Sequence, residues 1–213
     1  VGINLYSSKK RMFFELLQNA NDASAKAGVN MKVQICNGFF VVTHNGYAFN
    51  RSDFYSITSA AQSTKSANKK KTGYKGIGFK SVFSNSTCVY IKSRGFTFSF
   101  DKTNPEYEDF KAFYFKANGK TTPEEQSEFL KIYGDEYRQF RGVKDIPWQL
   151  LPIWDDTYPA DLKKSIFHLS ENVSIALAMP TDALEKYSQE VEEVFNNPRF
   201  MLFLRNTRRL QLL

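Results

Sequence analysis

Residues 13–23 read FFELLQNANDA, a stretch in which apolar and polar side chains recur at helical spacing. Each residue of an α-helix turns by about 100°, so side chains three or four positions apart share a face. The polar stripe on one side consists of Glu15, Asn19, Asp22 and Lys26. The pattern predicts a helix from Lys9 to Lys26. By itself, such a stripe is also typical of a surface helix that turns its polar face to water.

Two short strands are expected after this helix. They run from Met31 to Cys36 and from Phe39 to Thr43, and the dipeptide Asn37-Gly38 between them suits a tight type I′ hairpin turn. Asn45-Gly46 then ends the second strand in another turn. The sequence therefore predicts an antiparallel hairpin beside the first helix.

A short helix is expected after Ser52, because Ser52-Asp53 offers a cap and the next residues are largely apolar. The character of the chain then changes. From Ser59 to Thr72 nearly every residue is small, polar or a lysine, including Lys65, and such a segment buries too little apolar surface to pack itself. We expect a mobile loop.

A glycine-rich turn, GYKGIG, follows from Gly73 to Gly78 and leads into a predicted helix over residues 79–83. A turn of this kind can hold phosphate, because the first N–H groups of a helix favour an anion and glycine lets the backbone approach closely. Alone this signal is weak, since glycines occur in many loops.

The remaining chain alternates between strand and helix patterns. Residues 101–168 combine charges with many aromatic side chains, and we expect a partly helical insertion packed on the sheet. Strands are expected over 87–92, 96–100, 173–178 and 208–213, and a helix capped by Thr181 over 181–195. One domain over residues 1–213 is the expectation. Because the chain starts at Val1 and stops within an apolar run, we expect a fragment of a larger protein.

The order of these parts points to a family. Residues 14–23 resemble the signature helix of the GHKL superfamily of ATPases, and residues 72–83 are similar to its second glycine motif. Ser63 to Ser66 and Pro147 to Asp155 resemble the ATPase domains of its sacsin-like branch, which are themselves similar to the ninety-kilodalton heat-shock chaperones. The specific motifs cover residues 13–83. The resemblance implies an α+β two-layer sandwich of the Bergerat type, with a mixed, largely antiparallel sheet and helices on one face.

The resemblance also implies a function and a site. The function is binding of ATP or ADP with Mg²⁺ and slow hydrolysis, which would drive conformational change or dimerisation. Glu15 would activate the attacking water, Asn19 would coordinate Mg²⁺, and Asp22 would support the nucleotide. Residues 59–72 would form the ATP lid. The other expected nucleotide-binding residues are Gly46, Lys65, Gly73, Tyr74, Lys75, Gly76, Ile77, Gly78 and Phe79.

Two positions depart from the superfamily pattern. Where an aspartate usually accepts a hydrogen bond from the adenine amino group, this sequence has His44-Asn45-Gly46. Neutral His44, or the amide oxygen of Asn45, could accept that bond instead. The late strand, where a phosphate-contacting threonine is usual, offers Val173 and Ser174, and we assign no contact to either.

The composition limits which partners the protein can have and in which cellular compartment it is expected. The formal net charge is +7, which favours anionic partners such as nucleotides or nucleic acid. No stretch approaches the roughly 18 apolar residues of a membrane span, and Cys36 and Cys88 have no zinc-site spacing. We expect free thiols, no membrane partner and an intracellular protein, cytoplasmic or nuclear. Two alternatives stay open: a nucleotide-gated switch with negligible turnover, and a nucleic-acid or scaffold domain with a vestigial pocket.

Overall fold

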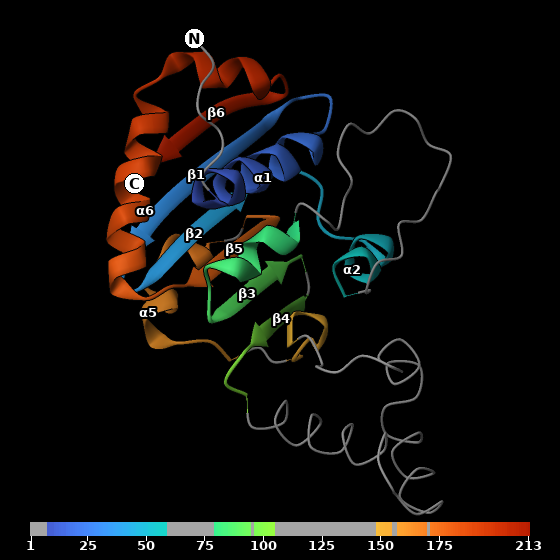
Figure 1. Cartoon of the computed structure of the whole chain (residues 1–213). Coiled ribbons are helices and arrows are strands. Elements are labelled where there is room, and N and C mark those ends of the chain that lie inside the picture. The colour runs from blue at the N-terminus through green and yellow to red at the C-terminus, as the bar shows by residue number, and fades with distance from the viewer. Residues whose placement is uncertain (1–7, 59–78, 95, 105–147, 155–156, 170) are drawn as a thin grey trace, which may run out of the picture.

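The computed structural model describes residues 8–58, 79–94, 96–104, 148–154, 157–169 and 171–213. A sheet of six strands in the order β4-β3-β5-β2-β1-β6 crosses the whole domain (Figure 1). The strands are β1 (Val29–Cys36), β2 (Phe39–His44), β3 (Cys88–Ser93), β4 (Phe96–Asp101), β5 (Val173–Ala178) and β6 (Thr207–Leu212). Every neighbouring pair is antiparallel except β1 and β6, which run parallel.

The predicted hairpin is present, with Asn37 and Gly38 both at positive φ as a type I′ turn requires. The pair lies inside the sheet, between β5 and β6, which both come from distant parts of the chain. β5 lies between β2 and β3 although more than seventy residues separate it from β3 in the sequence. Three of the five pairings between the described strands therefore join distant segments, and the two local pairings are β1 with β2 and β3 with β4.

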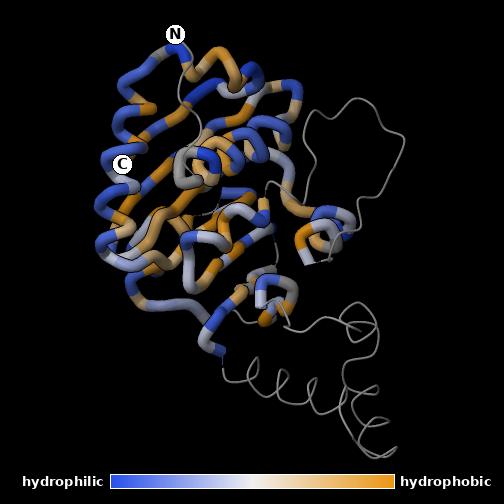
Figure 2. Tube along the Cα trace, in the orientation of Figure 1, coloured by the Kyte–Doolittle hydropathy of each residue, from blue (hydrophilic) through white to orange (hydrophobic). Residues whose placement is uncertain are grey.

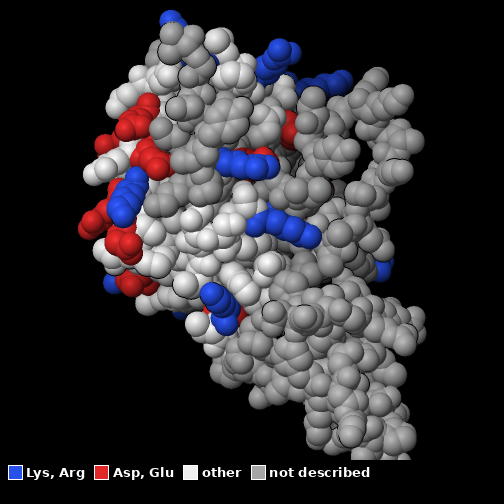
Figure 3. All heavy atoms as spheres, viewed as in Figure 1, with Lys and Arg blue, Asp and Glu red and all other residues white. Residues whose placement is uncertain are grey.

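Two long helices cover one face of the sheet, which we call the helical face. They are α1 (Ser8–Asp22) and α6 (Thr181–Phe195). Tyr187 of α6 is fully buried against Phe40 of β2 and Phe13 of α1, with ring centroids 4.8 Å and 6.5 Å away. The outer side of α6 is acidic, and Figure 3 shows these side chains gathered along it. Figure 2 shows the matching alternation of apolar and polar residues along α6.

The opposite face carries a smaller apolar cluster. Short helices α5 (Ala160–Lys163) and η3 (Ile166–His168) place Leu162 and Phe167 against Val41 of β2. These helices belong to the segment expected as an insertion, and the cluster seals a part of the sheet that α1 and α6 do not reach. Ile166 N–H donates to Gln34 Oε1 at 2.9 Å and ties this cover to β1.

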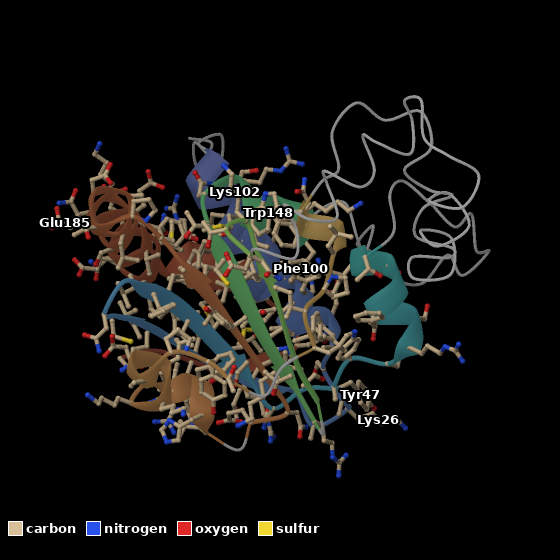
Figure 4. The ribbon with its side chains drawn as sticks, turned by 90° about the horizontal axis from the view of Figure 1, so that it is seen from below. Lys26, Tyr47, Phe100, Lys102, Trp148 and Glu185 are labelled. Carbon is tan, nitrogen blue, oxygen red and sulfur yellow. The ribbon has the colours of Figure 1, made fainter. Side chains whose placement is uncertain are left out.

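The described remainder of the insertion packs beside β4. Trp154 lies 5.3 Å from Phe98 and 4.9 Å from Phe54, measured between ring centroids. Ile153 pairs with Ser99 through two backbone hydrogen bonds, which covers part of the β4 edge. Figure 4 shows Trp148 of η2 (Trp148–Leu150) near Phe100. The rest of the expected insertion, residues 105–147, lies outside the described residues.

Several predicted boundaries were wrong. Helix α1 ends at Asp22 rather than Lys26, because the Ala23 carbonyl accepts Tyr47 N–H at 2.7 Å instead of continuing the helix. Residues 79–84 form a 3₁₀-helix, η1 (Phe79–Ser84). Helix α2 (Arg51–Thr58) is capped by Asn50 rather than by Ser52, and Thr181 is the first residue of α6 rather than its cap.

The expected fold class is confirmed. The described residues form an α+β sandwich with a mixed, largely antiparallel sheet. Cys36 and Cys88 are both free thiols, as expected. Burial raises the pKa of the Cys88 thiol to about 12, so this side chain stays protonated in moderately alkaline solution, where an exposed thiol ionises.

Candidate functional site

A pocket opens on the helical face where the C-terminal half of α1 meets α2 and the ends of β2 and β5. Its cavity volume is about 160 Å³. Leu16, Val42 and Ile175 give it an apolar floor. The other lining residues are Asn19, Ala20, Asp22, Ala23, His44, Tyr47, Ala48, Phe49, Asn50, Asp53, Ser56, Ile57 and Phe79. Ligand pockets commonly have about 300–1,000 Å³, so this cavity accommodates only part of a nucleotide-sized molecule.

Only part of the polar stripe of α1 lines this pocket. Asn19 and Asp22 line it, whereas half-buried Glu15, one turn earlier, does not. Asp22 Oδ1 accepts Gln18 Nε2 at 2.9 Å and Asn21 Nδ2 at 3.5 Å. A carboxylate has about four acceptor positions, so Asp22 retains the capacity to bind a ligand through Oδ2.

Asn21, between these residues in the sequence, has a structural role that the sequence analysis missed. Its side chain is 4% exposed. Its Oδ1 accepts Asn206 N–H at 2.9 Å and Thr207 Oγ1 at 3.3 Å. The side chain therefore joins the end of α1 to the start of β6. The sequence does contain a signal for this role, because Asn21 is a polar residue on the side of the helix that faces away from the polar stripe.

The end of β2 and the turn after it hold His44 and Asn45, the two residues predicted to accept a hydrogen bond from the adenine amino group. His44 lines the pocket and is 4% exposed, and its Nδ1 accepts Gly46 N–H at 3.2 Å. A neutral imidazole that accepts at Nδ1 carries its proton at Nε2. Asn45 is exposed, and its Oδ1 accepts Asn30 N–H at 2.8 Å, away from the pocket. Of the two, only His44 is positioned at the pocket.

Gly46 shapes the pocket wall without lining it. A Cβ at this position would lie 2.6 Å from the Ala23 carbonyl oxygen, a distance that requires the backbone to move. The turn therefore packs against the end of α1 only because residue 46 has no side chain. Asn172 Nδ2 donates to the carbonyls of Asn45 and Gly46, each at 3.0 Å, and anchors the same turn to the start of β5.

Helix α2 supplies the opposite wall. Asp53 N–H donates to Asn50 Oδ1 at 3.0 Å, and Asn50 N–H donates to Asp53 Oδ2 at 3.1 Å. This reciprocal arrangement is a capping box, which holds both side chains at the pocket. Tyr47, Phe49 and Asp53 line the pocket but were missed as site residues, because Asp53 was predicted only as part of a helix cap and no role was predicted for Tyr47 or Phe49.

Both described ends of the segment 59–78 reach this pocket. Ile57, near the end of α2, and Phe79, which follows Gly78, are lining residues and are 5% exposed. Burial of the next residue, Lys80, lowers the pKa of its ammonium group. The expected lid, residues 59–72, lies outside the described residues, as do Lys65, Gly73, Tyr74, Lys75, Gly76, Ile77 and Gly78.

The late strand β5 contributes one apolar side chain to the pocket. Ile175 of β5 lines the pocket, and its neighbour Ser174 therefore projects from the opposite face of the sheet. Ser174 and its cross-strand partner Thr43 are fully buried, and neither hydroxyl has a hydrogen-bond partner within the described residues. Ser174 is thus excluded from contact with a ligand in the pocket.

The described pocket lining is acidic. Asp22 and Asp53 are its charged side chains, and no lysine or arginine lies among these lining residues. No group of three or more metal-ligating side chains occurs in the described part of the chain. Magnesium needs no such group, because it commonly binds one or two protein oxygens together with substrate phosphates and water.

Comparison with known proteins places the domain among much longer chains. Residues 3–213 match the family model described as Sacsin domain. Protein NO VEIN of Arabidopsis thaliana is 36% identical over 46% of this chain and 4% of its own length. Sacsin of Homo sapiens is 32% identical over 45% of this chain and 2% of its own length. The chain thus spans a small fraction of either relative.

None of the helices in the described ranges combines the length and the apolar character that a bilayer crossing requires.

The match to the family model extends over nearly all of the sequence, from the residues before α1 through β6. It therefore includes the pocket lining and the segment between Ile57 and Phe79. The chain belongs to the sacsin domain family.

Proposed function

We propose that this domain binds ATP or ADP with Mg²⁺ in the pocket beside α1 and hydrolyses ATP slowly. One observation carries the proposal. Ile57 and Phe79, at the two ends of the segment with the expected lid and glycine turn, line the same cavity as Asn19 and Asp22. The signature helix, the turn after β2 and the residues that flank segment 59–78 thus meet at one pocket, an arrangement that supports their joint use as in GHKL ATPases.

The charge of the pocket supports a bound cation. Among the described lining residues, Asp22 and Asp53 are the charged side chains, and these two carboxylates attract Mg²⁺ and repel a bare phosphate. The amide oxygen of Asn19 is a hard ligand of the kind that magnesium accepts. In this proposal Asn19 holds the metal, Asp22 orients the nucleotide, and the backbone from Gly73 to Gly78 holds the phosphates. Bound Mg²⁺ would neutralise the phosphate charge beside these carboxylates.

The base would occupy the apolar part of the cavity, above Val42 and Ile175. Because His44 Nδ1 accepts Gly46 N–H, the ring offers a donor at Nε2 rather than the acceptor expected for the adenine amino group. We therefore propose that a pocket carboxylate, Asp22 or Asp53, accepts the amino group. His44 would then orient the turn and the wall of the pocket.

Glu15 is the proposed general base for hydrolysis. It lies seven residues before Asp22 and four before Asn19, so helix geometry places all three on one side of α1. A carboxylate at that position can orient a water and accept its proton. The relatives are much longer than this chain, and we propose that nucleotide turnover drives conformational change or dimerisation of such a larger protein.

Isothermal titration tests the binding proposal. ATP and ADP are titrated into the protein with Mg²⁺ and with a chelator, and GTP is titrated as the base control. We expect binding that requires Mg²⁺ and falls roughly tenfold or more in Asn19→Ala, as the loss of a charge-assisted ligand implies. Asn196→Ala, an exposed amide at the end of α6, is the matched control and should bind normally. Absence of heat at millimolar nucleotide would contradict the proposal.

A nucleotide-gated switch with negligible turnover is the second candidate. The observation in its favour is that Glu15 does not line the described pocket, whereas the binding residues Asn19 and Asp22 do. Steady-state phosphate release decides between the two. Binding without phosphate release above the Glu15→Gln background would support the switch.

A further inference from the structure

A second hollow lies next to the first along the chain and has the opposite character. It is formed by residues 24–28, between α1 and β1, and by residues 205–208, at the start of β6, and its volume is about 470 Å³. Lys26, Arg205 and Arg208 line it, and none of the described lining residues is acidic. We call it the basic hollow. None of its residues is among those proposed to bind the nucleotide.

A β-bulge places Arg208 in the basic hollow. Val29 pairs with Thr207 and the next residue, Asn30, pairs with Arg209, so Arg208 is an extra residue in the parallel ladder between β1 and β6. Bulges redirect the side chain of the extra residue out of the alternation of the strand. Arg208 is therefore directed away from the row of alternating β6 side chains, and its neighbour Arg209 is not among the lining residues.

Gly28 makes room for this arginine. It has a φ of +81°, and a Cβ at this position would lie 2.6 Å from Arg208 Cγ and 3.0 Å from Cδ. The aliphatic part of Arg208 thus lies directly over the glycine backbone. Because a side chain at residue 28 would displace it, the position of Arg208 depends on glycine there. The contact with Gly28 therefore holds the aliphatic part of Arg208 in place, and its guanidinium group extends into the hollow.

The buried Asn21 fixes the other side of the hollow. Asn206 donates its N–H to Asn21 Oδ1 at 2.9 Å, and its carbonyl accepts Val29 N–H at 2.8 Å. Residues 205–208 are thereby held against the 24–28 segment by bonds from α1 and β1. Pre-organised cations of this kind bind an anion without first losing backbone freedom.

No described acidic side chain pairs with the cations of the basic hollow. Among the described residues, Lys26, Arg205 and Arg208 form no salt bridge, in contrast to Lys32, which pairs with Glu171 at 2.7 Å. Three cations around a concave polar surface match a doubly charged phosphate, since the planar guanidinium binds two oxygens at once. Figure 4 shows Lys26 at the same end of the molecule as Tyr47, which lines the first pocket.

We propose that the basic hollow binds the phosphate monoester group of a small molecule. Its shape favours this ligand over a nucleic-acid strand, because strands are tracked by an extended basic stripe with aromatic side chains for stacking. Here the three cations line one concave site, and its described lining includes no aromatic side chain. The site is separate from the proposed ATP pocket, so either can exist without the other.

The experiment follows amide signals by NMR while ligand is added at constant ionic strength. The probes are glucose 6-phosphate, inorganic phosphate and, as the uncharged control, glucose. We expect saturable shifts of the Gly28 and Asn206 amides with both phosphate probes and none with glucose. Arg208→Gln and Arg205→Gln should each weaken binding roughly tenfold, the effect of one lost charge-assisted contact. Arg209→Gln makes the same charge change one residue away and should alter the affinity less than about twofold, since screening reduces distant charges.

Three outcomes would overturn the proposal. The first is the absence of saturable shifts at Gly28 and Asn206 at millimolar phosphate ester. The second is equal weakening by Arg209→Gln and Arg208→Gln, which would indicate only general attraction by surface charge. The third is a protein that binds a single-stranded oligonucleotide but not glucose 6-phosphate, with the oligonucleotide affinity lowered equally by Arg208→Gln and Arg209→Gln. Asn19→Ala should leave the phosphate-ester affinity unchanged, which separates this result from any failure of ATP binding.

Discussion

The helical face and the opposite face of the sheet bury their side chains in different ways. On the helical face, α1 and α6 build the larger apolar cluster, and the proposed ATP pocket opens within it. The opposite face has the small cluster under α5 and η3, together with the unpartnered hydroxyls of Thr43 and Ser174. The difference teaches that changes on the helical face can affect both stability and the site, whereas changes on the opposite face should affect stability alone.

The largest expected effect is at Phe40, on the helical face. Its side chain is fully buried between Tyr187 and Phe13. Phe40→Ala leaves a cavity at this point and should lower the free energy of unfolding by about 3–5 kcal/mol. Urea denaturation followed by circular dichroism measures the loss. Phe203→Ala, at a side chain that is 59% exposed, is the control and should change stability by less than about 0.5 kcal/mol.

The second prediction isolates chemistry from stability on the same face. Glu15→Gln keeps the size of the side chain but removes the proton acceptor, so ATP hydrolysis should fall by roughly a hundredfold, about 2.7 kcal/mol in the barrier. ATP affinity should stay within about threefold. Phosphate release under saturating ATP is the measurement, and Glu185→Gln on the outer side of α6 is the control (Figure 4). If Glu15→Gln hydrolyses ATP as fast as the parent, Glu15 is not the base.

A third change tests whether the opposite face is independent of the pocket. Leu162 of α5 is fully buried against the small cluster. Leu162→Ala should lower the free energy of unfolding by about 2 kcal/mol, less than at Phe40 because the short helix can close over part of the cavity. Nucleotide affinity, measured by titration below the unfolding transition, should be unchanged. A matching loss of affinity would show that the two faces are coupled.

A smaller effect of opposite sign is expected at Thr43 and Ser174. These hydroxyls are buried without partners among the described residues, and replacing both groups by apolar ones of similar shape removes their desolvation penalty. The double variant Thr43→Val with Ser174→Ala should raise the free energy of unfolding by about 1 kcal/mol. Thermal unfolding checks the sign. Destabilisation would indicate that bound water satisfies the two hydroxyls.

The last prediction concerns a loss of stability that occurs only at alkaline pH. Burial raises the pKa of Cys88 from 9.0 to about 12, and the pKa of Tyr90 on the same face is raised for the same reason. Between pH 9 and 12 the unfolded chain releases protons that the folded protein retains, so stability falls as pH rises through that window and is independent of these groups below it. Urea midpoints at pH 7.5 and 10 measure the slope. Cys88→Ala should reduce it, and an unchanged slope would assign it to other groups.

Most of the elements could be predicted because their signals are local. The helical spacing in residues 13–22, the Asn37-Gly38 turn and the alternation in the strands depend on neighbouring residues only. The predicted end of α1 was wrong because a distant group competes for the backbone: Tyr47 takes the Ala23 carbonyl. That partner cannot be identified from the local pattern. The predicted cap of α2 was wrong for a local reason, because Asn50 and Asp53, three residues apart, form a capping box that the choice of Ser52 passed over.

The candidate site could be predicted only in part, for the same reason. Asn19, Asp22, His44 and Phe79 were predicted from motif positions and line the pocket, whereas Asp53 and Tyr47 line it without having been predicted as site residues. The orientation of Asn21 toward β6 rather than toward the pocket depends on a residue 185 positions away. Motifs identify which side chains are available, but contacts between distant segments determine which of them meet.

The sequence alone specifies the periodic helices and strands, the hairpin turn and the type of chemistry that the polar stripe and the glycines can support. The tertiary structure specifies the strand order, the division of residues between the two faces, and the hollow that Arg208 enters. Local patterns act through the conformational preferences of adjacent residues. Strand order and the bulge at Arg208 arise instead from the register between β1 and β6, whose paired residues are more than 170 positions apart, and register is set by packing over that distance.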